Sequence, residues 1–281
     1  MPQPRPWEHC IGLGLESVYG VAVAPTIFVP GTSSLKKPTG RVVLESAIGE
    51  WEESRMTQRP TKVEGTLELE VGPGRTELLR TWLGRRDRRT MRSATVIDTY
   101  GDQTGFVSAG VCAKSASMKC ASNEDLMISV DCLGRTRLRT TPVVPTYPDL
   151  VAPYVFEEMI ATIAGGPEYH LSEVEINWDW QVQDDKFRSD GTGLLREVPT
   201  DGQSVLVTLQ HDFEHAALWD QAMSGVQVAL SLVFTRGSQV MTLAMPRCNY
   251  DEGDVEDNMQ PITLRALKGL DGTAAVTWSE S

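Results

Sequence analysis

The fold of this chain is decided by an alternating stretch and by the short amphipathic stretch after it, Gly65-Thr66-Leu67-Glu68-Leu69-Glu70-Val71 and Glu77-Leu78-Leu79-Arg80-Thr81-Trp82-Leu83-Gly84. Side chains of a β-strand point alternately to its two faces, so the first stretch predicts a strand with an apolar face and an acidic face. The second stretch predicts a helix, for which Thr76 is a suitable N-cap and Gly84 a suitable stop. Together they predict a sheet with a helix beside it.

The same order of strand, helix and glycine returns roughly 140 residues later, a spacing in the range of a small domain. There the strand is Val205–Gln210, the helix Phe213–Met223 and the glycine Gly225. The clearest alternation in the chain, Ser172–Val182, lies in the same half and places its two tryptophans on an apolar face. These patterns predict an internally duplicated unit.

Most of the remaining sequence has strand periodicity and turn residues, and it predicts about a dozen strands and two short helices. The fold class is therefore mainly β, a sandwich or barrel with short flanking α-helices. A proline-spaced stretch around residues 139–153 favours a linker. We expect an N-terminal arm at residues 1–40, a first β-rich unit at 41–145 and a second β-rich half or repeat at 146–281.

Length and composition describe an ordinary globular protein. The chain has 281 residues, of which 41% are hydrophobic and 23% charged, enough for one large or two modest cores. No apolar run is long enough to span a bilayer, and the prolines near the N-terminus are unlike a signal peptide. The five cysteines are an odd number without CxxC spacing, which favours reduced thiols over a disulfide framework or a zinc knuckle.

The charge balance argues against a protein that grips nucleic acid, because the formal net charge is −12 and phosphate binding needs a basic face. Two local clusters stand out. One is basic and comprises Arg85, Arg86, Arg88 and Arg89; the other is acidic and comprises Asp251, Glu252, Asp254, Glu256 and Asp257. Each is either a solvated loop or half of a complementary contact between subunits.

The sharpest enzymatic pattern is His211-Asp212-Phe213-Glu214-His215, which matches the H-x-x-E-H arrangement of one class of zinc peptidases. A zinc-dependent peptidase using His211, Glu214 and His215 is therefore an alternative function. Two histidines four apart bind one zinc ion when they share a helical face. Because Asp212 is the natural N-cap after the strand, His211 falls outside the helix, and we expect no metal site here.

No other catalytic pattern emerges. The chain lacks a G-x-S-x-G elbow, a complete dinucleotide-binding fingerprint and a Walker lysine motif. Cys112, Cys120 and Cys132 fall in predicted strands, where a thiol is usually a small buried hydrophobe. We therefore expect no enzyme, no cofactor and no metal.

With these pieces in order, the chain resembles a tail tube (major tail) protein of a long-tailed bacteriophage. The resemblance rests on the strand Val63–Leu69, the helix Leu78–Gly84, the hairpin Phe106–Leu133, the strand Glu173–Val182 and the stretch Val205–Met245. It implies a structural virion protein with a β-sandwich and a flanking helix. Such proteins form rings whose inner strands close into a continuous β-barrel, and the rings stack into the tube through which DNA is ejected.

The resemblance also implies partners and surfaces. The chain would pair with itself in a hexameric ring, or in a trimeric ring of pseudo-sixfold symmetry if the unit is duplicated, and would meet the tape-measure protein and the tail terminator and tip proteins. DNA would pass without specific binding, no membrane would be involved, and the protein would be made in the host cytoplasm for the virion tail. The expected lumen residues are Glu64, Glu68, Glu70, Glu173, Glu175 and Asp179. The expected contacts between subunits or rings are the arm and the two charged clusters. A baseplate or adhesion β-sandwich is the remaining alternative.

Overall fold

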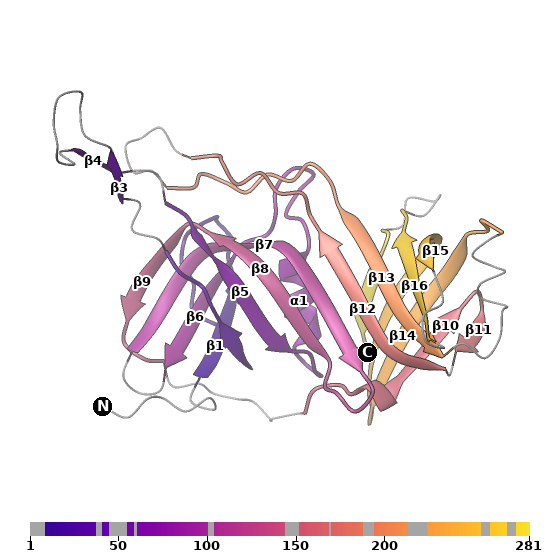
Figure 1. The fold of residues 1–281 in the computed structure, drawn as a ribbon. Helices are drawn as coiled ribbons and strands as arrows, with labels where there is room; N and C mark the ends of the chain where they lie inside the picture. The colour runs from indigo at the N-terminus through magenta and orange to yellow at the C-terminus, as the bar shows by residue number, and fades with distance from the viewer. Residues whose placement is uncertain are drawn as a thin grey trace.

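The computed structural model describes residues 9–37, 41–44, 55–58, 61–100, 104–143, 152–168, 170–187, 194–212, 224–253, 259–268 and 274–281. Strands dominate this part of the chain, which has a single α-helix, so the predicted mainly β class is confirmed (Figure 1). The elements are β1 (His9–Leu15), β2 (Ile27–Ser33), β3 (Arg41–Leu44), β4 (Arg55–Gln58), β5 (Val63–Glu70), α1 (Thr76–Leu83), β6 (Ala94–Tyr100), β7 (Thr104–Ala121), β8 (Met127–Gly134), β9 (Thr136–Thr140), β10 (Met159–Ile163), β11 (Gly166–Glu168), β12 (Leu171–Asp179), β13 (Ser204–Asp212), β14 (Val228–Arg236), β15 (Gln239–Gly253), β16 (Met259–Ala266) and β17 (Thr277–Glu280), with a 3₁₀ turn at Phe156–Glu158.

The first half closes into a barrel of six antiparallel strands. Its order is β7-β6-β1-β2-β5-β8, and β8 pairs with β7 to complete the circle. Strand β9 continues the line of β8 along β7. The hairpin β3–β4 forms a separate two-stranded sheet that projects away from the barrel (Figure 1).

The long strand β7 joins the two halves into one sheet. Its first part, residues 104–111, pairs with β6, and its last part, residues 115–121, pairs with β12. The sheet then continues in the order β12-β13-β16-β15-β14-β10-β11, and β17 pairs with β15. A strand of 18 residues is long enough to serve two neighbours in succession along one edge.

The second half repeats the topology of the first. Strands β5, β6, β7 and β8 pair in the order β6-β7-β8-β5, and β13, β14, β15 and β16 pair in the order β14-β15-β16-β13. The irregularities recur as well: the register shift between Ala113 and Ser115 of β7 matches the one between Tyr250 and Glu252 of β15. The two halves thus share the order of four strands and the position of one bulge, and we call them unit 1 (β1–β9) and unit 2 (β10–β17).

The N-terminal segment differs from the expected arm, because β1 and β2 are barrel strands of unit 1. Two glycines in β1 hide its strand pattern. A Cβ atom at Gly12 would lie 2.9 Å from Cβ of Pro25, and one at Gly14 would lie 2.5 Å from the Ala24 carbonyl oxygen. The segment after β1 folds back so closely that only glycine fits at these positions, whereas Ile11 and Leu13 are buried in the core.

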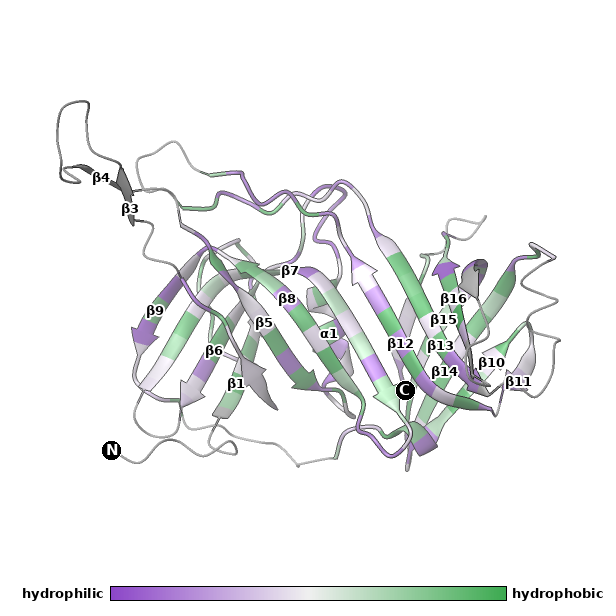
Figure 2. Ribbon diagram, in the orientation of Figure 1, coloured by the Kyte–Doolittle hydropathy of each residue, from purple (hydrophilic) through white to green (hydrophobic). Residues whose placement is uncertain are grey.

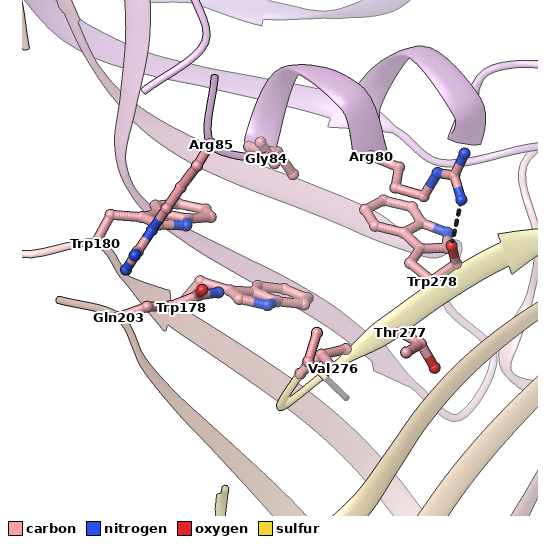
Figure 3. A pocket seen from close by; sticks show the side chains of 11 residues that line it. Arg80, Gly84, Arg85, Trp178, Trp180, Gln203, Val276, Thr277 and Trp278 are labelled. Atoms are coloured by element: carbon pink, nitrogen blue, oxygen red, sulfur yellow. Dashed lines mark hydrogen bonds between the residues drawn. The ribbon is translucent and has the colours of Figure 1, made fainter. Parts of the chain in front are cut away.

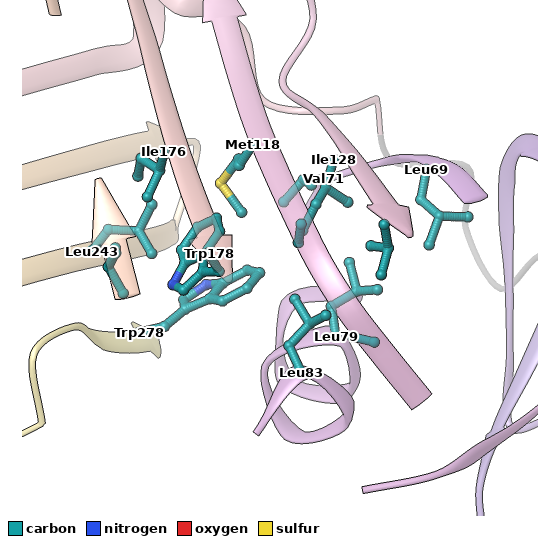
Figure 4. Close-up of a cluster of buried hydrophobic side chains, with 14 of the residues drawn as sticks. Leu69, Val71, Leu79, Leu83, Met118, Ile128, Ile176, Trp178, Leu243 and Trp278 are labelled. Atoms are coloured by element: carbon teal, nitrogen blue, oxygen red, sulfur yellow. The ribbon is translucent and has the colours of Figure 1, made fainter. Parts of the chain in front are cut away.

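The core follows the alternation of the strands. Hydrophobic and hydrophilic residues alternate in bands along β5, β8 and β12 (Figure 2). Where the units meet, Leu79 and Leu83 of α1, Met118 of β7, Trp178 of β12 and Trp278 of β17 gather in one cluster (Figure 4). Helix α1 of unit 1 therefore packs into a core that both units share.

We predict that Gly31→Ala destabilises the protein by about 1–3 kcal/mol, because overpacking costs of this size arise when the backbone must shift. A Cβ atom at Gly31 would lie 2.1 Å from the Glu68 carbonyl oxygen, across the β2–β5 pairing. Gly166→Ala is the control, since the nearest atom to its new Cβ would be 3.7 Å away. Urea unfolding measures both; equal midpoints for the two variants would contradict this account of Gly31.

Candidate functional site

One face of the sheet is polar and runs through both units. A row of directly paired residues crosses five strands, from Thr66 through Asp131, Ser115 and Asp179 to Ser204. Because directly opposite residues share a face, this row fixes which side chains lie together. The six carboxylates singled out from the sequence, Glu64, Glu68, Glu70, Glu173, Glu175 and Asp179, alternate with buried residues of β5 and β12 and lie on that face.

The polar side chains of this face bond to one another across the strands. Asp131 accepts hydrogen bonds from the hydroxyls of Thr66 at 2.8 Å and Ser115 at 3.0 Å. Where the units meet, Ser117 donates to Glu175 at 2.8 Å and Lys119 forms an ion pair with Glu173 at 3.0 Å. These bonds cross from β8 to β7 and from β7 to β12. The polar network therefore spans the junction between the units.

Cations on this face are held by neighbouring carboxylates. The hydrogen bond from Lys119 to Glu173 raises the pKa of that ammonium group. Arg265 of β16 contacts Asp251 at 2.6 Å, and this hydrogen bond raises the pKa of the guanidinium. The same arginine donates to Ser204 of β13 at 3.1 Å. Both cations thus stay charged and neutralise only their own partners, which leaves carboxylates in excess on the face.

The face is hollowed at the junction rather than closed. A hollow of about 390 Å³ lies over β8, β7, β12 and β13, and Ser115, Ser117 and Ser129 are among the residues that line it. Because serine side chains are small, the surface of the sheet is recessed at this place. The hollow is half open and has hydroxyl, amide and carboxylate groups in its lining, so it lacks the enclosure of a typical small-molecule site.

The arginine cluster is tied to unit 2 through its backbone. Asp87 accepts hydrogen bonds from the backbone N–H groups of Arg89 and Thr90, which lowers the pKa of its carboxyl. The Arg89 carbonyl in turn accepts a bond from the N–H of Thr200, which follows β12 in unit 2. Arg85 is partly buried, whereas Arg86, Arg88 and Arg89 are exposed. The loop therefore presents three arginines from a fixed backbone.

Arg85 lines a pocket of about 360 Å³ together with Arg80, Trp178, Trp180 and Trp278 (Figure 3). Trp178 and Trp180 are buried, as the alternation of their strand predicts. Arg80 of α1 donates to the Trp278 carbonyl oxygen at 3.0 Å. The pocket thus lies between α1 of unit 1 and the ends of β12 and β17 of unit 2, as part of the contact between the units.

The acidic cluster begins in β15. Asp251 is exposed and bonded to Arg265, and Glu252 pairs in register with Thr263. Asp254, Glu256 and Asp257 lie outside the described residues. Strand β15 extends to Gly253, so the cluster starts within the sheet and not in a loop beside it.

His211 does not have the geometry of a helical zinc site. It lies inside the strand β13, which extends two residues beyond the predicted end at Gln210, to Asp212. The His211 ring is buried, and its Nε2 atom lies 3.1 Å from a carboxylate oxygen of Glu168. Glu214 and His215 lie outside the described residues, as does the predicted helix at 213–223. Among the described residues, no group of three metal-ligating side chains comes together.

Comparison with known proteins identifies the architecture. A family model described as phage tail tube protein matches residues 7–277, nearly the whole chain. The chain belongs to the phage tail tube protein family. No curated protein sequence matches it significantly. It is therefore a structural protein of a viral tail, which points away from the peptidase alternative. No helix in the described segments is long and apolar enough to cross a membrane.

Sequence reasoning missed the residues between the two predicted acidic strands. Asp131, Ser115, Ser117 and Lys119 complete the polar face, and they come from β7 and β8. The alternation in β8 was a usable signal. Ser129 and Asp131 are not buried, whereas Ile128, Val130 and Cys132, which alternate with them, are buried. The register that sets Ser117 and Lys119 beside unit 2 has no such signal in the sequence.

We predict that none of the five cysteines reacts with a thiol reagent at pH 8 while the tail tube protein is folded. None of the five is in a disulfide, and all five are buried. Burial raises the pKa of Cys120 to about 12 and that of Cys248 to about 11, and it raises those of Cys112 and Cys132 as well. The reactive thiolate is therefore scarce. Titration with a chromogenic disulfide should give five thiols only after unfolding in guanidinium; rapid reaction of the native protein would contradict this.

Proposed function

We propose that this tail tube protein assembles into stacked rings whose shared polar face lines the channel for DNA ejection. The observation that carries the proposal is the polar face, rich in carboxylates on β5 and β12, which continues from β5 of unit 1 to β13 of unit 2. A group of strands that is apolar on one side and acidic on the other can close around a polar channel, because its apolar side still packs into the hydrophobic core.

The charge of the face suits transport without adhesion. Phosphates bind to basic surfaces, whereas a channel lining with carboxylates in excess repels them. A chain with a formal charge of −12 gives a ring a strongly negative potential. Glu64, Glu68, Glu70, Glu173, Glu175 and Asp179 are the residues that we assign to the lumen. DNA then slides past without specific binding.

The duplicated unit favours a ring of three chains. The resemblance to tail tube proteins implies six units around the channel, and this chain supplies two copies of the unit. Three chains, at 30.9 kDa each, then make a pseudo-sixfold ring of about 93 kDa, whereas a hexamer would be twice as heavy. Within the virion tail, the tube encloses the tape-measure protein and ends on the terminator and tip proteins. The chain itself is made in the host cytoplasm.

We predict that Glu68→Lys, Glu175→Lys and Asp179→Lys together leave tube assembly intact but slow DNA ejection. The three side chains lie on the polar face, away from the core, and lysine would attract phosphates that carboxylates repel. Ejection in vitro from particles carrying the variant measures the effect. The charge-neutral set with glutamine and asparagine is the control. An unchanged ejection rate for the lysine set would argue against an electrostatic lining.

We also predict that Arg86→Glu, Arg88→Glu and Arg89→Glu give a folded protein that forms rings but not long tubes. These exposed side chains project from a loop fixed by Asp87 and Thr200, a suitable surface for contact with the next ring. Salt screens such contacts, so tube length in negative-stain images should fall with rising ionic strength for the parent protein. Lys268→Glu, an exposed charge change elsewhere, is the control. Parent-like tubes from the triple variant at low salt would remove this loop from stacking.

A further inference from the structure

The two units differ in the hairpin with which each begins. Strand β1 lies between β6 and β2 in unit 1, as β10 lies between β14 and β11 in unit 2. Thirteen residues separate Leu13 from its partner Ile27, whereas only two separate Ile163 from its partner Gly166. Since a two-residue turn is enough for the fold of unit 2, the longer connection in unit 1 indicates a further role. We call residues 16–26 the insertion loop.

Hydrogen bonds tie the insertion loop to the barrel of unit 1. The Glu16 N–H donates to the Ser93 carbonyl at 3.0 Å. The Glu16 carboxylate accepts bonds from the Gly20 N–H at 2.8 Å and from the Thr95 hydroxyl at 2.9 Å. That hydroxyl in turn accepts a bond from the Val23 N–H at 3.0 Å. The backbone of the loop is therefore held in place, and its exposed side chains form a defined surface.

The exposed surface of the insertion loop is apolar. Val18 is 56% exposed and Val21 is 54% exposed, and Ala22 beside them is exposed as well. Residues 17–35 contain no charged side chain, although 23% of the whole chain is charged. Single exposed apolar residues are common, but several on one ordered loop mark a surface for contact with another molecule.

An exposed apolar residue of unit 2 has a buried counterpart in unit 1. In the two hairpins Leu13 corresponds to Ile163, so Cys10, three residues earlier, corresponds to Ile160. Cys10 is buried, whereas Ile160 is 53% exposed. The insertion loop thus belongs to unit 1 alone, and the exposed isoleucine belongs to unit 2 alone.

The insertion loop and Ile160 lie at opposite ends of the molecule. Four antiparallel pairings in succession lead from β5 to β13, so these corresponding strands run in the same direction and the units share one orientation. The loop follows the end of β1, where Leu15 pairs with Ala94, whereas Ile160 lies at the start of β10. In a head-to-tail stack, the loop of one chain therefore faces the start of β10 in the next ring.

We propose that the insertion loop of one chain docks on the surface around Ile160 of a chain in the next ring, so that unit 1 always stacks on unit 2. This inference rests on the proposed stacked rings and sets their relative rotation. Rings built from two different units can stack with like units aligned or with unlike units aligned. Only the second arrangement covers both apolar surfaces, because each of them is present on one unit only.

Charges beside the two apolar surfaces support a second copy of this chain as the partner. The insertion loop adjoins the arginine loop through its bond to Ser93, and Arg86, Arg88 and Arg89 are exposed there. Two exposed carboxylates lie before the start of β10: Glu157 in the 3₁₀ turn, and Asp125, which forms a bridge with the residue preceding that turn. Opposite charges around an apolar contact favour this pairing of ends and disfavour the pairing of like ends.

Chemical cross-linking tests which units lie over each other. Tubes of the double variant Val21→Cys with Ile160→Cys are treated with a short bis-maleimide, and the buried native thiols do not interfere. Denaturing gels should show a ladder that extends beyond three chains, because the contact joins one ring to the next. The control pair is Val21→Cys with Leu138→Cys, since Leu138 of unit 1 is 68% exposed. A ladder from the control pair, or none from the first pair in intact tubes, would overturn the register.

A charge placed on the loop provides a second test. Val21→Asp should keep the unfolding midpoint of the parent, because the side chain is exposed, and should form rings. It should form no tubes at concentrations where the parent does, since docking would bury a carboxylate. Val226→Asp is the matched control, because Val226 is 57% exposed and lies outside the loop. If Val21→Asp forms tubes as readily as the control, the docking contact is wrong; if the parent forms neither rings nor tubes, the proposed function fails as well.

Discussion

The antiparallel pairing of β7 with β12 is the interaction on which the rest of the structure depends. It joins two copies of one unit into a single sheet, and it does so with a strand that already holds the first barrel together at its other end. Helix α1 and β17 cover the apolar side of this pairing, where Trp178 and Trp278 lie against Leu83. The polar side carries Ser117, Lys119 and their carboxylate partners. Core and polar face are therefore both continuous across the junction.

The period of a β-strand explains how one sheet serves two purposes. In the middle of β5 and β12 buried apolar residues alternate with less buried polar ones, as in Leu67-Glu68-Leu69-Glu70 and Val174-Glu175-Ile176-Asn177. A shift of one residue in the β7–β12 register would put carboxylates into the core and tryptophan on the polar face. The bulge between Ala113 and Ser115 determines which residues of β7 face the core just before the junction. A bulge at the corresponding place in β15 changes the facing of that strand in the same way.

Sheet edges also explain why the unit is duplicated within a chain. An edge of unpaired backbone groups invites association with any other strand, and a ring removes edges by closure. One junction of each chain is covalently linked and cannot form wrongly, because β12 and β7 belong to the same molecule. In the proposed ring, duplication would halve the number of contacts that separate chains have to form.

The sequence by itself determined the mainly β class, the apolar and polar faces of β5 and β12 and the presence of helix α1. Each of these follows from local periodicity, which acts over a few neighbours. The expected N-cap Thr76 is instead the first residue of α1, and its hydroxyl donates to Glu280 of β17. Strands β1 and β2 were missed, because glycines that serve close packing with distant residues remove the apolar pattern. The extent of β13 was missed at His211 and Asp212, because these residues belong to the strand through their pairing with Gln260 and Met259 of β16, which are distant in the sequence. Only the tertiary structure decided which strands pair at the junction between the units, because register depends on bulges and contacts between residues far apart in the chain.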